Sequence, residues 1–198
     1  MNGDPAAAAD RENVLRWNAD RDPQAFTVLI RRHEPALRRV AAAVLGSAAR
    51  RDPELLADAL QEGYRRMLDA LRGYRGESDP FAFLAAVLRR ACLDTLRRET
   101  RARSRAERAA VFGAEGAAAA AVDPAGEAER AILADRVLSA LDRLGEPDRS
   151  LVYLRDAEGL AVADLSAAFR MPEGTVKSRL ARARIRLRRI LAEEGVEP

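Results

Sequence analysis

Residues Gly159–Arg189 read GLAVADLSAAFRMPEGTVKSRLARARIRLRR, and this stretch decides the fold class of the C-terminal part of the chain. The spacing of its apolar residues predicts a short helix over residues 162–169 and a long helix from Glu173 onward. Between them, Arg170-Met171-Pro172 forms the turn. Two helices joined by such a turn are the layout of a helix-turn-helix, so we predict a DNA-binding motif here.

The long second helix has an apolar stripe on one side and mainly basic residues on the rest of its surface. At ~100° per residue the apolar members share one narrow side, which we expect to pack on the domain core. They are Val176, Leu180, Ala183, Leu187 and Ile190. Residues 170–191 carry eight bases against one acid, a local net charge of +7. Ile185 lies away from the stripe, and we interpret it as a contact for a protein partner.

In a helix-turn-helix the first residues of the second helix meet base edges in the major groove, and later cations hold phosphate. We therefore predict that bases are read by Lys177, Ser178, Arg179 and Arg182. Gly174, Thr175 and the free N–H groups of the first turn can hold a phosphate, and Arg184 is placed among the later cations. Arginine-rich composition alone also produces basic surface helices, so a helix without a DNA target is the alternative.

Charge is segregated along the rest of the chain as well. Residues 89–108 hold eight arginines against three acids, net +5, whereas residues 109–135 hold one arginine against five acids, net −4. Two basic segments separated by an acidic one suggest two contacts with a single polyanion. For either segment alone, a solvated helix face remains an equally good reading.

Asp-Pro pairs mark the helix starts of the N-terminal half. They stand at residues 22–23, 52–53 and 79–80, where aspartate can cap the helix and proline takes its first position. The first helix is expected to end at Gly46 and to be kinked or broken by Pro35. The second is expected to end at Gly73, and a loop over residues 73–79 leads into the third.

Residues 104–126 lose helical periodicity and contain five consecutive alanines followed by Asp123-Pro124. Order is predicted to resume near Glu127 with a helix closed by Gly145, then a short helix opened by Pro147 and ended by Gly159. The predicted fold is all-α, with two small helical domains joined by a flexible linker. Its segments are an N-terminal tail (1–22), a first domain (23–103), an Ala/Gly-rich acidic linker (104–129) and a helix-turn-helix domain (130–198).

Composition excludes several function classes. The chain has 198 residues, a net charge of +3, one cysteine and one histidine. Cys92 cannot form an internal disulfide, and with His33 it is too little for a zinc site or a nucleophile–base pair, so we expect no enzyme, no metal and no cofactor. No apolar run approaches the ~20 residues of a membrane span, and no secretory signal opens the chain. We expect a cytoplasmic protein with no membrane insertion.

The run Gly174-Thr175-Val176-Lys177-Ser178-Arg179-Leu180, with Arg182-Ala183-Arg184 after it, resembles the C-terminal DNA-reading domain of a known family. The family is the extracytoplasmic-function (ECF) group of bacterial RNA polymerase sigma factors. Asp58-Ala59-Leu60-Gln61-Glu62-Gly63-Tyr64 is similar to the family's Asp-Leu-Val-Gln-Glu-x-Phe helix. Residues 74–78, Phe81-x-Phe83-Leu84 and Asp94-x-x-Arg97-Arg98 resemble its promoter-opening loop and helix.

The resemblance implies a promoter-specificity subunit that is inactive alone. It implies a −35 element read by Thr175, Lys177, Ser178, Arg179, Arg182 and Arg184, and a −10 element melted and read by Tyr74, Arg75, Ser78, Arg90, Asp94, Arg97 and Arg98. The clamp coiled coil of the largest polymerase subunit would bind Asp58, Gln61, Glu62, Tyr64 and Arg65, and the flap of the second subunit is a further implied contact. The resemblance also implies an anti-sigma protein that covers the polymerase-binding surface.

Three positions depart from the family pattern. Phe83 stands where a tryptophan is usual and Arg90 where an asparagine is usual, so the base preference of the downstream element cannot be carried over. Arg170 stands where glycine is frequent, and arginine is strained there if the turn needs a positive φ.

For Asp94, pairing with Arg97 or Arg98 on the helix surface is as good a reading as a nucleic-acid contact.

Two other functions remain open from the residues. An autonomous helix-turn-helix regulator would bind duplex DNA without polymerase, and a dimer footprint on a palindrome would favour it. A helical interaction protein would use the basic helix to bind an acidic partner instead of DNA. The regulator does not explain the motif at residues 58–64 or the second basic segment, and salt-insensitive failure to bind any promoter, with or without polymerase, would favour the interaction protein.

Overall fold

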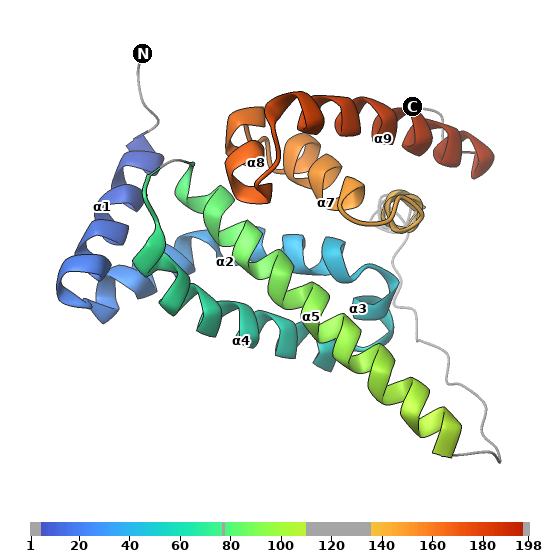
Figure 1. Cartoon of the computed structure of the whole chain (residues 1–198), viewed down its shortest axis with the longest axis horizontal. Coiled ribbons are helices and arrows are strands. Elements are labelled where there is room, and N and C mark those ends of the chain that lie inside the picture. Colours follow the sequence, from blue (N-terminus) through green and yellow to red (C-terminus); the bar gives the residue numbers. More distant parts are fainter. Residues whose placement is uncertain (1–4, 77, 110–135, 196–198) are drawn as a thin grey trace, which may run out of the picture.

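The computed structural model describes residues 5–76, 78–109 and 136–195, and throughout these residues the secondary structure is helical. An N-terminal unit contains helices α1 to α5, and a C-terminal unit contains α7 to α9 (Figure 1). The two units pack against each other, with α8 against α5 and α7 against α2. The all-α prediction is confirmed for the described residues. Most of the predicted linker, from residue 110 on, lies outside them.

The N-terminal unit consists of long helices joined by short turns. They are α1 (Pro5–Asp20), α2 (Pro23–Leu45), α3 (Ser47–Arg51), α4 (Pro53–Ala70), the 3-10 turn η1 (Leu71–Gly73) and α5 (Pro80–Ala109). The Asp-Pro starts are confirmed, because the carboxylates of Asp22, Asp52 and Asp79 each accept backbone N–H groups of the first turn that follows.

The predicted tail contains a helix. Val14 of α1 is buried, and the Trp17 ring packs on Phe26 with ring centroids 5.3 Å apart. Asn18 donates to the carbonyl of Leu71 at 3.0 Å, which fixes the helix end to η1. These contacts are with residues distant in sequence, so the weak periodicity of α1 did not reveal them.

Two helices run further than the sequence predicts. Of the kink or break expected at Pro35, the break is wrong, because α2 continues from Pro23 to Leu45 through this residue, and the kink stays a prediction. Pro35 lies on the exposed side, where water can hydrogen-bond the carbonyl that the missing N–H leaves free. Buried Leu29 and Leu37 hold the two halves of α2 in one core. Likewise, α5 continues to Ala109, past the domain boundary predicted at residue 103.

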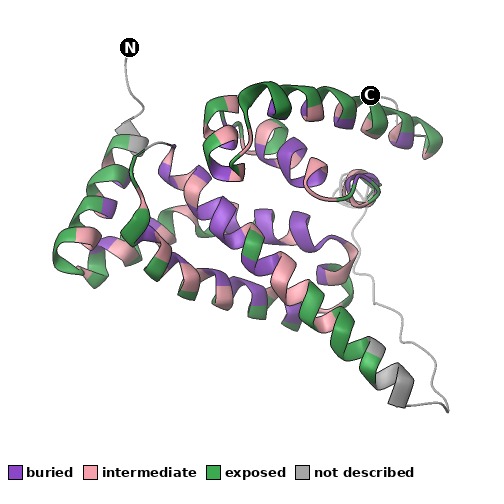
Figure 2. Ribbon diagram, in the orientation of Figure 1, coloured by how far each residue is buried: buried purple, intermediate pink, exposed green. Residues whose placement is uncertain are grey.

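The core of the N-terminal unit lies among α2, α4 and α5. The buried positions of these helices are purple in Figure 2. The fully buried side chains include Leu29, Leu37, Met67, Leu84 and Leu88. Cys92 is buried beside them, and desolvation raises the pKa of its thiol to about 12, as expected for a core residue.

The C-terminal unit begins with helical residues 136–142 and a turn at Gly145, where φ is +69°. It continues with α7 (Asp148–Val152), a π-helical turn η2 (Tyr153–Ala157), α8 (Val162–Phe169) and α9 (Glu173–Glu193). Both helices of the predicted helix-turn-helix begin where the sequence indicated. The π-helical turn is a feature that the apolar spacing did not predict.

Polar contacts join the two units at several points. Arg39 of α2 makes a two-point hydrogen bond with Glu158 at 3.0 Å, and the N–H of Asp79 donates to Asp164 at 2.7 Å. Near the end of α2, Asp142 accepts from the N–H of Ser47 at 2.7 Å. The units therefore meet through matched charges as well as through the shared apolar core.

Candidate nucleic-acid interface

Helix α9 has the two-sided character that the sequence predicts. Val176, Leu180, Ala183 and Ile190 are buried toward α7 and α8, while Leu187 is half-buried. Most of the side that faces away from the rest of the unit is exposed (Figure 2). The exposed residues near the start of the helix include Thr175, Lys177, Ser178 and Arg182. A basic helix presented in this way can enter the major groove of DNA.

Several cations of α9 are held by carboxylates of their own unit. Arg179 donates to Asp148 at the start of α7 at 2.8 Å, and only a third of its side chain is exposed. Arg184 makes a two-point contact with Asp156, with Nε 3.1 Å from Oδ2. Arg179 thus lies at the contact between α7 and α9, and base reading by it requires that the pair with Asp148 open or rotate.

The turn before α9 contains the strained residue that the sequence suggested. Arg170 has φ +54° and ψ +47°, the left-handed conformation that glycine adopts at little cost. Its N–H donates to the carbonyl of Ala167, and the side chain of Ser166 donates to the carbonyl of Met171 at 2.6 Å. The turn is therefore fixed by local hydrogen bonds despite the arginine.

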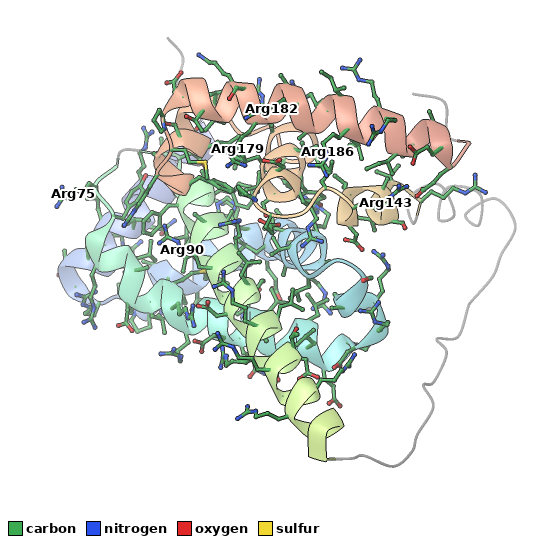
Figure 3. All side chains as sticks on the ribbon, turned by 45° about the vertical axis from the view of Figure 1, so that its right-hand side comes forward. Arg75, Arg90, Arg143, Arg179, Arg182 and Arg186 are labelled. Carbon is green, nitrogen blue, oxygen red and sulfur yellow. The ribbon has the colours of Figure 1, made fainter. Side chains whose placement is uncertain are left out.

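The loop at residues 74–79 lies between η1 and α5, close to α8. Tyr74 packs edge-on against Phe83 with ring centroids 5.1 Å apart, and its hydroxyl donates to the carbonyl of Ser78 at 2.5 Å. Ser78 is buried, whereas Arg75 is exposed (Figure 3). In this conformation Arg75 is accessible to nucleic acid and the Ser78 side chain is not.

The N-terminal half of α5 is partly covered by the C-terminal unit. Arg89 donates to Glu146 at 2.9 Å and to Ser150 at 3.2 Å, and its guanidinium lies 4.7 Å from the ring centre of Phe169. Arg89, the first arginine of the basic segment 89–108, is therefore engaged within the protein in this structure. Arg90 stays exposed, and desolvation together with nearby Arg170 lowers its pKa.

Asp94, further along α5, is bound by arginines. It accepts from Arg66 of α4 at 2.6 Å and from Arg97 at 3.3 Å, and these contacts lower the pKa of its carboxyl. In this structure Asp94 is therefore an ion-paired acid, which is the alternative to a nucleic-acid contact. Arg66 was missed by the sequence reading, because its partner is 28 residues away along the chain.

Four of the residues predicted to bind polymerase share one side of α4, namely Asp58, Gln61, Glu62 and Arg65, whereas Tyr64 lies toward Glu34 and Arg38 of α2 and packs against the core. Asp58, Gln61 and Arg65 are exposed, whereas Glu62 and Tyr64 are half-buried. Glu62 accepts from Arg65 at 2.8 Å and 2.9 Å and from Arg66 at 2.7 Å, and these contacts lower the pKa of its carboxyl to about 2. The Glu62 carboxyl is consequently ionised throughout the physiological pH range.

Within the described part of the chain, no group of three or more histidine, cysteine or acidic side chains is arranged to hold a metal ion. The helices described are also too short or too polar to cross a lipid bilayer.

Two family models match the chain. Sigma-70 region 2 matches residues 29–102, and Sigma-70 region 4 matches residues 134–187. These spans contain the α4–α5 surfaces and the helix-turn-helix described above. Helix α1 lies before the first match.

Similar proteins include two sigma factors. ECF RNA polymerase sigma factor SigM of Mycobacterium tuberculosis is 37% identical over 173 residues, covering 86% of this chain and 79% of that protein. RNA polymerase sigma-H factor of Pseudomonas aeruginosa is 28% identical over 177 residues, covering 82% of this chain and 84% of that protein.

Solved structures share the fold. CnrH, in complex with the cytosolic domain of CnrY, superimposes with a TM-score of 0.66 at 22% identity, covering 93% of this chain and 98% of that one. The sigma factor RpoE, in complex with the anti-sigma factor NepR from Bartonella quintana, gives a TM-score of 0.60 at 23% identity, covering 84% and 96%. By its identity to SigM and its region 2 and region 4 matches, the chain belongs to the ECF sigma factors.

Proposed function

We propose that this chain binds core RNA polymerase and directs it to promoters, with α9 reading the −35 element and α5 with the preceding loop melting the −10 element. The observation that carries the proposal is the construction of α9. Its apolar stripe is buried while Lys177, Ser178 and Arg182 are exposed at its start, which is the arrangement of a recognition helix in the major groove.

The downstream contact is supported by the loop at residues 74–79 and by α5. A base that leaves the stack costs a few kcal/mol, and an aromatic pair beside exposed cations offers it stacking and phosphate contacts. Tyr74 and Phe83 form that pair, and the exposed Arg75 follows Tyr74 in the loop. Arg90 is exposed about two turns beyond Phe83 on α5. We interpret these residues as the melting site.

The polymerase contact is assigned to Asp58, Gln61, Glu62, Tyr64 and Arg65. Support comes from Asp58, Gln61 and Arg65, which are exposed together on one side of α4 and offer a partner both charged and polar contacts. An anti-sigma protein is proposed as a second partner for the same surface, since two structural neighbours of this chain were solved with partner proteins, one of them named an anti-sigma factor.

Run-off transcription on a fragment library of the source genome tests the function. Core polymerase is used with and without this protein, and the protein is expected to produce discrete new transcripts. Alignment of the upstream sequences then gives both promoter elements. Direct DNA binding without new transcripts would instead identify an autonomous regulator. Failure of the protein to bind either DNA or polymerase would overturn both the sigma-factor function and the regulator.

A further inference from the structure

A groove of about 1090 Å³ lies between α4 and α5. One wall belongs to α4 and carries Asp58, Gln61, Glu62 and Arg65. The opposite wall belongs to the C-terminal half of α5 and carries Arg98, Arg101 and Arg105. The residues assigned to polymerase binding therefore form only half of a two-sided surface.

The groove has the size of a helical segment. Its walls span residues 55–65 of α4 and 95–105 of α5, which is ~15 Å along each helix at ~1.5 Å per residue. A third helix of about three turns lying along the groove would contact both walls over this length.

The two walls differ in charge. On α4, the carboxylate of Asp58 lines the groove, whereas that of Glu62 is paired with Arg65 and Arg66, so Asp58 is the acidic group that this wall offers to a partner. On α5, neither Arg101 nor Arg105 takes part in a salt bridge within the described residues, and both are exposed. Glu99, also on the α5 wall, is 3.8 Å from Arg103. A partner helix that fits must present basic side chains to α4 and acidic side chains to α5.

We propose that Arg98, Arg101 and Arg105 form the second wall of the polymerase docking groove, which seats a helix of the polymerase core with basic and acidic sides. This extends the polymerase contact from α4 onto α5 and rests on the proposed function. It also changes the assignment of Arg98, for which the family resemblance implies a role at the −10 element. Arg98 lines the same groove as Glu62, so a helix seated on Glu62 meets Arg98 as well.

Binding of the full-length chain to core polymerase without DNA tests this assignment. The chain carries a fluorophore at its N-terminus, and anisotropy gives the Kd for core enzyme. The double variant Arg98→Glu, Arg105→Glu is expected to bind about tenfold or more weakly, because it places like charges opposite the acidic side of the partner. Arg98→Lys with Arg105→Lys keeps the charges and is expected to bind within about twofold of wild type.

Two further variants separate the possible explanations. Arg31→Glu with Arg72→Glu, two exposed charge reversals outside the groove, matches the change in net charge of the double variant and is expected to bind like wild type. Asp58→Arg tests the α4 wall independently, and circular dichroism with thermal melting confirms that each variant is folded. Binding by the double variant equal to that of wild type, with Asp58→Arg impaired, would overturn the α5 assignment and leave the proposed function standing. Failure of wild type itself to bind core would overturn both.

Discussion

The guanidinium of Arg149 donates to the backbone carbonyl of Val44 at 2.6 Å, which joins the C-terminal unit to the last turn of α2. The same side chain is 3.0 Å from Asp142 and 3.3 Å from Glu146, and Arg149 is 9% exposed. A buried arginine with three partners holds the two units in one arrangement. Glu146 in turn binds Arg89, so the network reaches α5.

Arg149→Ala is expected to lower the free energy of unfolding by about 2 kcal/mol, because it removes a buried guanidinium from two carboxylates and leaves the Val44 carbonyl without its side-chain donor. Urea denaturation followed by circular dichroism measures this change. Arg143→Ala is the matched control, since Arg143 is half exposed in its contacts with Glu193 and Glu194 and is expected to change stability by about 0.5 kcal/mol at most. Equal effects of the two variants would contradict the role of the network.

Gly46→Ala is expected to destabilise the chain by about 2 kcal/mol or more through overpacking and backbone strain. An added Cβ would lie 2.0 Å from Oδ1 of Asp142, and φ at this residue is +59°. Gly145→Ala is a control that separates the two causes, because φ is +69° there and no heavy atom lies within 4 Å of the added Cβ. Thermal melting should show the larger loss for Gly46→Ala, and an equal loss would mean that the close approach to Asp142 is relieved at no cost.

The Glu62 carboxyl is expected to titrate with a pKa of about 2, against an ordinary value of 4.5. Because the folded-state pKa is the lower one, the stabilisation that Glu62 provides is present above about pH 4.5 and is lost as the pH falls toward 2. Carbon-detected NMR of the side-chain carboxyl measures the titration directly. Arg66→Ala should raise this pKa, and an unchanged value would show that Arg66 does not stabilise the charge.

Arg170→Gly is expected to raise the free energy of unfolding by about 1 kcal/mol, because glycine adopts the left-handed conformation of the turn without the strain of a Cβ. The melting temperature should rise by a few degrees. Arg170→Ala removes the charge and keeps the strain, so it should not produce this gain. Stabilisation by both variants alike would assign the effect to charge, with Arg90 as the neighbour.

Arg182→Ala is expected to weaken recognition of particular −35 bases by ~1–3 kcal/mol, whereas Arg188→Ala should weaken binding of all sequences alike. Both residues are exposed on α9, Arg182 near its start and Arg188 nearer its end. Transcription or binding with single-base variants of one promoter, at fixed salt, distinguishes the two. The same relative loss on every promoter variant for both substitutions would contradict the assignment of Arg182 to base reading.

Local patterns revealed most of the helices. The Asp-Pro pairs gave helix starts because capping and the fixed φ of proline act within one turn, and the stripe of α9 gave its buried face because periodicity follows from helix geometry. The same local rules failed at Pro35 and in α1. There, packing of Leu29 and Leu37, and of Val14 and Trp17, against distant residues outweighed weak or contrary local preference.

The sequence by itself determined the all-helical class, the helix-turn-helix and the presence of two basic segments, since these depend on neighbours along the chain. Only the tertiary structure decided which cations are exposed. Arg179 and Arg182 look equivalent in sequence, yet Asp148 holds one and not the other. Arg89 is covered by Phe169, and Arg98 faces Glu62 across a groove. Each of these outcomes depends on a partner far away along the chain, which no local pattern encodes.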